Sequence, residues 1–167
     1  PTAIMAAIGQ ATKHGVIIKS GEALEKMGRV DTVAFDKTGT LTFGRLEVSD
    51  ILPFEETLTE TELLSLAASA EAKSEHPLGK AIVACAKERK LSMAESDVFQ
   101  MTAGKGVCAK VAGRTLLCGS EKFLLERGAV PDGRVYVALE KLRSEGKASV
   151  LVAEGTRCSA VISLSDA

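Results

Sequence analysis

The chain has 167 residues, 21 basic and 22 acidic side chains, a net charge of −1 and an apolar content of 46%, which predicts a soluble globule of one domain, or one domain with parts of a second. The balanced charge, without a block of Lys and Arg, excludes an evident nucleic-acid surface, and the absence of Trp removes a main platform for base stacking. No apolar run approaches the roughly 20 residues of a membrane helix, and no signal peptide is recognisable.

The first 43 residues alternate helical and apolar segments. The predicted segments are a helix over 2–12, a strand over 16–19, a helical turn over 21–27 and a strand over 31–35. The chain starts without Met, at Pro1, a residue typical of a helix start, and Lys13 and Gly15 end the first helix. This order predicts a parallel α/β unit with Asp36 at a strand's carboxyl end, where ligands gather in open α/β sheets.

Residues 42–162 predict an α+β domain in which helices cover an antiparallel sheet. Thr59 and Glu62 form a capping-box pattern at the start of its first helix. Glycines at 104, 106 and 113 mark hairpin turns. The predicted elements are a strand over 46–52, helices over 59–70 and 77–90, short strands between 98 and 119, helices over 120–127 and 135–143, and a hairpin of 148–152 with 158–164.

The cysteines suggest packing rather than chemistry. They form no Cys-x-x-Cys pair, and neither His lies at zinc-ligand spacing from them. Apolar neighbours predict small buried hydrophobic residues in a reducing compartment, which indicates the cytosol. The four are Cys85, Cys108, Cys118 and Cys158.

The run Val-Ala-Phe-Asp-Lys-Thr-Gly-Thr-Leu-Thr, residues 33–42, is the strongest chemical signal in the sequence. A carboxylate at a strand end, followed by Gly and hydroxyl residues, suits in-line attack on a phosphoryl group, with Asp36 as the nucleophile. Mg²⁺ fits as a hard cation bound by the carboxylate, a backbone carbonyl and water. The alternative is that Asp36 only caps a turn.

Residues 36–42 resemble, at every position, the phosphorylation signature Asp-Lys-Thr-Gly-Thr-(Leu/Ile)-Thr of the P-type ATPases. The resemblance implies that Asp36 accepts the γ-phosphate of ATP, that Thr38 gives its carbonyl to Mg²⁺, and that Lys37, Thr38 and Gly39 shape the phosphate pocket. Related phosphatases of the haloacid dehalogenase-like superfamily carry a second Asp where this chain has Thr38, which cannot act as a general acid at neutral pH. A persistent acyl phosphate, and hence a pump intermediate, is therefore favoured over a simple phosphatase.

The segment Glu-Ala-Lys-Ser-Glu-His-Pro-Leu, residues 71–78, precedes a predicted helix. Pro77 suits the first helical position, so His76 or Ser74 could serve merely as the cap. The segment also resembles the Ser-Glu-His-Pro-Leu signature of the heavy-metal-transporting branch of that family. The resemblance implies that His76 packs against adenine and that Glu71 faces the base.

The segment Gly-Lys-Gly-Val-Cys-Ala, residues 104–109, reads by itself as a hairpin turn and not as a Rossmann site, because no helix opens at Gly106. In the heavy-metal branch this Gly-x-Gly lets the backbone approach the nucleotide, which implies that Gly104 and Gly106 contact it. Gly119 and Ser120 match a Gly-Asn pair of the family, with Ser120 in place of Asn and a shorter reach.

The resemblance covers essentially the whole chain and implies three parts: residues 1–43 as the N-terminal part of a phosphorylation domain, 44–162 as a nucleotide-binding domain, and 163–167 as the returning phosphorylation domain. The fold class is thus an α+β nucleotide-binding domain, an antiparallel sheet with flanking helices, attached to a partial α/β haloacid dehalogenase-like phosphorylation domain. Later family motifs that complete the phosphate and Mg²⁺ sites are missing from the sequence, as are the transmembrane helices.

The sequence therefore predicts a piece of a heavy-metal P-type ATPase at the cytoplasmic face of a membrane. We expect it to bind ATP and Mg²⁺ with little or no turnover, because only part of the electrostatic support for phosphoryl transfer is present. Its expected partners are the rest of the phosphorylation domain, the actuator domain and the transmembrane helices, and no nucleic acid. The alternatives are a stand-alone nucleotide-binding or regulatory module and a haloacid dehalogenase-like phosphatase.

Overall fold

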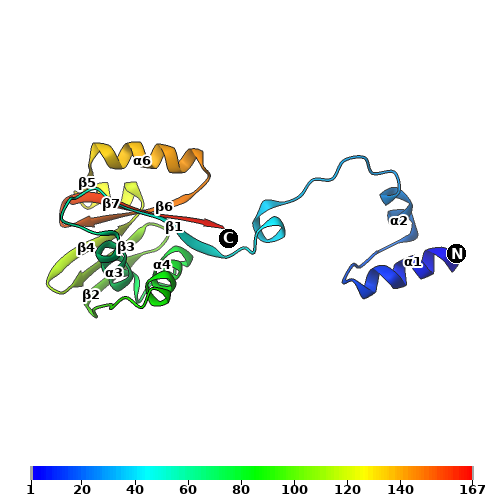
Figure 1. The fold of residues 1–167 in the computed structure, drawn as a ribbon, viewed down its shortest axis with the longest axis horizontal. Helices are drawn as coiled ribbons and strands as arrows, with labels where there is room; N and C mark the ends of the chain where they lie inside the picture. The colour runs from blue at the N-terminus through cyan, green and yellow to red at the C-terminus, as the bar shows by residue number, and fades with distance from the viewer. Residues whose placement is uncertain (1, 167) are drawn as a thin grey trace. The chain divides into compact units, whose positions relative to one another are not determined.

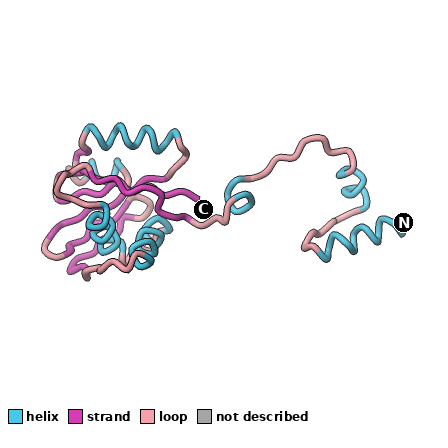
Figure 2. The backbone as a smooth tube through the Cα atoms, in the orientation of Figure 1, coloured by secondary structure: helices cyan, strands magenta, loops and turns pink. Residues whose placement is uncertain are grey.

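The computed structural model describes residues 2–166, apart from the side chains of Lys37 and Thr38, and the chain divides into two compact units, Pro1–Lys37 and Thr38–Ala167. The first unit holds helices α1 (Thr2–Lys13) and α2 (Gly21–Met27), which match the predicted helical ranges (Figures 1 and 2). Ser20 caps α2, since its hydroxyl accepts the N–H of Ala23 at 3.1 Å. Neither helix contains a buried residue.

The strands predicted over 16–19 and 31–35 are absent, and the prediction of these two strands is wrong for this structure (Figure 2). A strand is stabilised by hydrogen bonds to a neighbouring strand, and the described residues of the first unit include none. Val33 and Phe35, within the second of these predicted strands, are 66% and 65% exposed. Asp36 consequently follows an extended coil rather than a paired strand.

The second unit is built on one sheet with the strand order β1-β7-β6-β4-β3-β2, in which all these neighbours are antiparallel. A short strand, β5, pairs in parallel with β7. The strands are β1 (Leu46–Pro53), β2 (Ser96–Thr102), β3 (Gly106–Val111), β4 (Arg114–Gly119), β5 (Val130–Pro131), β6 (Ala148–Glu154) and β7 (Arg157–Asp166). The antiparallel sheet and its hairpins confirm the prediction for this part of the chain.

Helices cover both faces of this sheet (Figure 1). The helices are α3 (Glu60–Glu71), α4 (Pro77–Glu88), α5 (Glu121–Glu126) and α6 (Gly133–Ser144). Helices α3 and α4 pack into one buried apolar cluster, and α5 and α6 into a second. Successive residues of β4 alternate between the clusters, with Leu116 and Cys118 in the first and Leu117 in the second. Because both faces are covered, the central strands read as continuous apolar runs.

Local signals from the sequence account for how the helices begin. The capping box of α3 is present: the Thr59 hydroxyl accepts the N–H of Glu62 at 3.2 Å, and the Glu62 carboxylate accepts the N–H of Thr59 at 2.9 Å.

Of the cysteines, all free, Cys118 and Cys158 are buried as predicted, whereas Cys85 and Cys108 are only half-buried. Burial raises the pKa of the Cys158 thiol to about 11, which makes it unreactive.

The ends of the second unit meet on its edge strand pair. Strand β7 pairs with β1 up to Asp166, which lies opposite Leu46. The hydroxyl of Thr42 donates to Oδ2 of Asp166 at 2.6 Å. The strand runs unbroken across residue 162, so the domain limits at 43 and 162 remain predictions. No helix in the described part of the chain has the length and apolar character to cross a bilayer.

Candidate functional site

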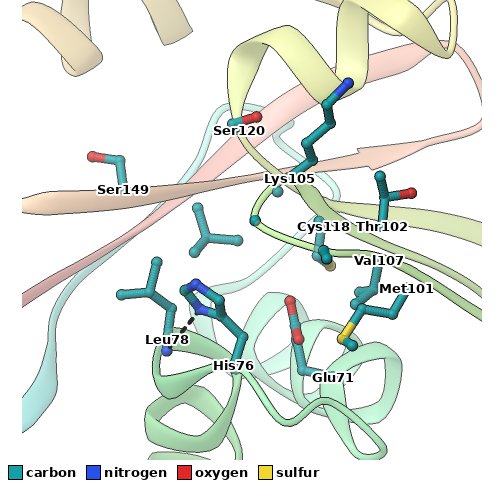
Figure 3. Close-up of a pocket in the computed structure, with 16 residues that line it drawn as sticks. Glu71, His76, Leu78, Met101, Thr102, Lys105, Val107, Cys118, Ser120 and Ser149 are labelled. Carbon is teal, nitrogen blue, oxygen red and sulfur yellow. Dashed lines mark hydrogen bonds between the residues drawn. The ribbon is translucent and has the colours of Figure 1, made fainter.

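A cavity of about 350 Å³ opens at one end of the sheet of the second unit (Figure 3). Its walls come from four places: the α3–α4 connection, the β2–β3 turn, the β4–α5 junction and the start of β6. The lining includes all five residues that the sequence predicts to bind a nucleotide, which are Glu71, His76, Gly104, Gly106 and Ser120. The fold thus brings together residues that are up to 49 positions apart, the separation of 71 and 120 in the sequence.

Glu71 is the last residue of α3 and is only 5% exposed. Its Oε2 atom lacks a hydrogen-bond partner among the described residues. Burial raises the pKa of the Glu71 carboxyl, and a hydrogen bond with the Ser74 hydroxyl acts in the opposite direction. A buried carboxyl with an unused oxygen beside a cavity is a strong candidate to hydrogen-bond a ligand.

Gly79, which sequence reasoning did not single out, makes room for that carboxyl. A Cβ atom at this position would lie 2.3 Å from Oε2 of Glu71 and 2.8 Å from Oγ of Ser74. The available signal was a Gly in the first turn of α4, where Gly weakens a helix and therefore needs a reason. Here the reason is the close approach of α4 to the end of α3.

His76 both caps α4 and lines the cavity, so the two interpretations of this residue are compatible. Its Nδ1 accepts the N–H of Leu78 at 3.2 Å, and its own N–H donates to Oγ of Ser74 at 3.3 Å. Because Nδ1 is an acceptor, the neutral ring carries its hydrogen on Nε2. The ring is exposed and stands between Leu78 and Glu71 at the cavity (Figure 3).

The glycines around the β2–β3 turn serve different purposes. Gly104 has φ +69°, in the left-handed region that favours Gly, and a Cβ there would meet nothing within 4 Å. Gly106 and Gly119 face each other across β3 and β4. A Cβ on Gly106 would lie 2.4 Å from the carbonyl oxygen of Cys118, and one on Gly119 would lie 2.5 Å from that of Lys105. The backbones approach closely and leave a wall free of side chains.

Ser120 contributes less than the sequence suggests. Its Oγ caps α5 by accepting the N–H of Phe123 at 3.2 Å, and its N–H donates to the carbonyl of Lys105 at 2.9 Å. The hydroxyl hydrogen is the group left to donate to a ligand.

The apolar walls of the cavity, which the sequence analysis missed, carry no motif: they are ordinary core positions such as Val107 and Val150.

The second candidate region is the loop that begins at Asp36. Asp36 is exposed and lies one residue before the end of the first unit. The predicted roles of the Lys37 and Thr38 side chains lie outside the described residues. Residues Lys37–Leu41 form a π-helical turn, in which Gly39 has φ +74°. The N–H of Gly39 lies 3.4 Å from Oγ1 of Thr42.

The Mg²⁺ ligands predicted from the sequence are oxygen donors of Asp36 and Thr38. The carboxylate of Asp36 and the backbone carbonyl of Thr38 are hard oxygen donors of the kind that Mg²⁺ prefers. In the described part of the chain, no three His, Cys, Asp or Glu side chains gather into a group able to hold a metal. The predicted binding of Mg²⁺ by Asp36 and Thr38 stays a prediction.

Comparison with known proteins gives a consistent picture. A family model described as haloacid dehalogenase-like hydrolase matches residues 30–167. The copper-exporting P-type ATPase of Bacillus subtilis is 39% identical over 99% of this chain and 20% of its own length. The probable copper-exporting P-type ATPase of Archaeoglobus fulgidus is 40% identical over 99% of this chain and 20% of its own length. A manganese-exporting P-type ATPase of Mycobacterium bovis is 37% identical over 99% of this chain and 23% of its own length.

Solved structures agree. A zinc-transporting PIB-type ATPase in the E2.Pi state matches 99% of this chain and 26% of its own chain, with a TM-score of 0.82 and 36% identity. The N-domain of a copper-transporting P-type ATPase matches 71% of this chain and 99% of its own, with a TM-score of 0.61 and 29% identity. The catalytic domain of the CPx-ATPase CopB-B matches 95% of this chain and 53% of its own, with a TM-score of 0.56 and 28% identity. That structure is described as showing conformational changes upon nucleotide binding.

Proposed function

The chain belongs to the haloacid dehalogenase-like hydrolase family, and because its relatives are metal-exporting P-type ATPases, we propose that it is the ATP-binding and phosphorylation-site region of a heavy-metal pump. It spans about one fifth of the length of the copper-exporting relatives. The observation that carries the proposal is the convergence of five predicted nucleotide contacts around one cavity. Three separate segments of the chain supply these five residues, so proximity in sequence does not explain their convergence.

The cavity offers a suitable surface for each part of a nucleotide. The neutral His76 ring, held by its bond to the N–H of Leu78, presents a flat face on which adenine stacks. The carboxyl of Glu71, which lines the cavity, accepts a hydrogen bond from the exocyclic amine of the base. The wall at Gly104 and Gly106 lets the ribose and phosphates lie against backbone, and the Ser120 hydroxyl donates a further bond.

The phosphorylation step uses Asp36. A carboxylate oxygen of Asp36 forms a bond to the γ-phosphorus of ATP, the bond to the β–γ bridging oxygen breaks, and ADP leaves with that electron pair. The Asp36 carboxylate and the Thr38 carbonyl would hold Mg²⁺, which when bound would supply positive charge to the phosphate oxygens. Thr38 offers no general base for the attack of water, so the aspartyl phosphate persists. In the whole pump, the actuator domain and the membrane helices would complete the machinery. The free energy of hydrolysis of the aspartyl phosphate would then drive metal transport from the cytoplasmic face.

Nuclear magnetic resonance of the ¹⁵N-labelled chain tests the nucleotide site. We expect ATP and adenosine to shift the amide signals of His76, Gly104, Gly106 and Gly119, and to leave those of α6, whose residues do not line the cavity, in place. An absence of shifts at the cavity, or shifts elsewhere, would contradict the proposal. Steady-state ATP hydrolysis should be close to background, and release of phosphate from aryl phosphates would favour the phosphatase alternative instead.

A further inference from the structure

Charge is unevenly distributed around the cavity. Among the described residues that line it, the ionisable side chains are Glu71, His76, Cys118 and Lys105, and Lys105 alone is a permanent cation. A nucleoside fits such a lining, but a triphosphate carries several negative charges that need a cationic partner. Lys105 lies at the middle of the Gly104–Gly106 turn, on the wall proposed to meet the phosphates.

The backbone of Lys105 is held in place, while its side chain is long and flexible. Its N–H donates to the carbonyl of Thr102 at 3.0 Å, and its carbonyl accepts the N–H of Ser120 at 2.9 Å. The side chain extends from the turn towards α5 (Figure 3). Four rotatable bonds lie between this fixed Cα and the ammonium group, so the charge can be redirected without moving the turn.

Without a ligand, the ammonium group is paired with Glu126 of α5. Nζ lies 2.8 Å and 3.0 Å from the two carboxylate oxygens, and the side chains are 39% and 44% exposed. The hydrogen bond from Lys105 lowers the pKa of Glu126. An ion pair this exposed contributes little stability, so a phosphate group that competes for the same ammonium meets a small barrier.

We propose that Lys105 is the phosphate-binding side chain of this cavity and that Glu126 competes with the phosphates for it. The inference rests on the proposed function and adds to it the residue that separates nucleoside triphosphate from nucleoside. Two consequences of opposite sign follow. Loss of the ammonium weakens binding in proportion to the number of phosphates, and loss of the competing carboxylate strengthens it.

The test measures dissociation constants of adenosine, AMP and ATP by calorimetry or NMR titration, in buffer without Mg²⁺ so that the phosphates keep their charge. We expect Lys105→Met to raise the Kd of ATP about tenfold, that of AMP less, and to leave that of adenosine unchanged. Glu126→Gln should lower the Kd of ATP about two- to fourfold and leave that of adenosine unchanged. For both variants, the difference in ATP affinity from the wild type should become smaller as salt is added.

Lys122→Met is the matched control. The substitution removes the same charge from a nearby exposed position on α5, and Lys122 does not line the cavity. It should change ATP affinity less than twofold. An equal loss for Lys105→Met and Lys122→Met, an equal loss for adenosine and ATP, or weaker ATP binding in Glu126→Gln would overturn the role of Lys105. In each of these cases adenosine still shifts the cavity signals of the wild type; if neither adenosine nor ATP shifts them, the proposed function itself fails.

Discussion

The two units of this chain show how differently the same kinds of local signal are realised. Helix α1 in the first unit has 12 residues and buries none, whereas α3 in the second unit, also of 12 residues, buries seven. Both helices form where capping and composition predict them. The apolar runs of the first unit remain coil, while those of the second unit become paired strands. Helices are thus specified locally, but strands and cores require partners from elsewhere in the chain.

The strongest way to test this contrast is to truncate one side chain in each unit. Leu64→Ala removes a fully buried side chain from α3 and should lower the free energy of unfolding by about 2–5 kcal/mol. Met5→Ala in α1, where the side chain is 69% exposed, should change it by less than about 0.5 kcal/mol. Urea denaturation followed by circular dichroism measures both. Comparable losses in the two variants would show that the units are energetically equivalent.

A second test concerns close packing at the cavity. Gly79→Ala places a methyl group against the Glu71 carboxyl, which should cost about 1–3 kcal/mol of stability and weaken adenosine binding as Glu71 moves. Gly133→Ala is the control, because this Gly also lies in the first turn of a helix but its Cβ would meet nothing within 4 Å. That variant should be neutral or slightly stabilising. If both variants behave alike, the space beside Glu71 does not matter.

Helix caps allow a matched comparison between the units. Thr59→Ala removes the capping box of α3 and should cost the second unit about 1 kcal/mol in thermal or urea unfolding. Ser20→Ala removes the cap of α2, which buries no residue, and should leave the main unfolding transition unchanged while reducing the helical signal slightly. A shift of that transition by the Ser20 variant would link α2 to the core of the second unit.

The smallest expected effect depends on pH. Hydrogen bonds from Lys147 and Ser163, mainly, lower the pKa of Asp50 from 3.8 to about 2. Since the folded pKa lies below the unfolded one, this stabilisation is present above pH 3.8 and is lost as the pH falls towards 2. The carboxylate is partly exposed, so we expect less than about 1 kcal/mol. Asp50→Asn should flatten the stability profile between these pH values; an unchanged profile would contradict the assignment.

Much of the second unit follows from short-range patterns. The capping box at Thr59, Pro77 at the first position of α4 and the glycine at 104 each act within four residues, and all of them occur where predicted. The residues predicted to bind a nucleotide lie in recognisable motifs and line one cavity, while their binding role stays a prediction. Gly79 and the pairing of Lys105 with Glu126 were missed, since their roles depend on atoms brought near by folding.

For this protein, the sequence alone was enough to indicate the helices, the hairpins, the chemical motif at Asp36 and the residues suited to a nucleotide, because each depends on neighbours along the chain. The tertiary structure decided which apolar runs became strands, how close α4 lies to Glu71, and that a single cavity collects five distant residues. The physical reason is that strand pairing, burial and charge competition arise between segments far apart in the chain, whose meeting only the packed core determines.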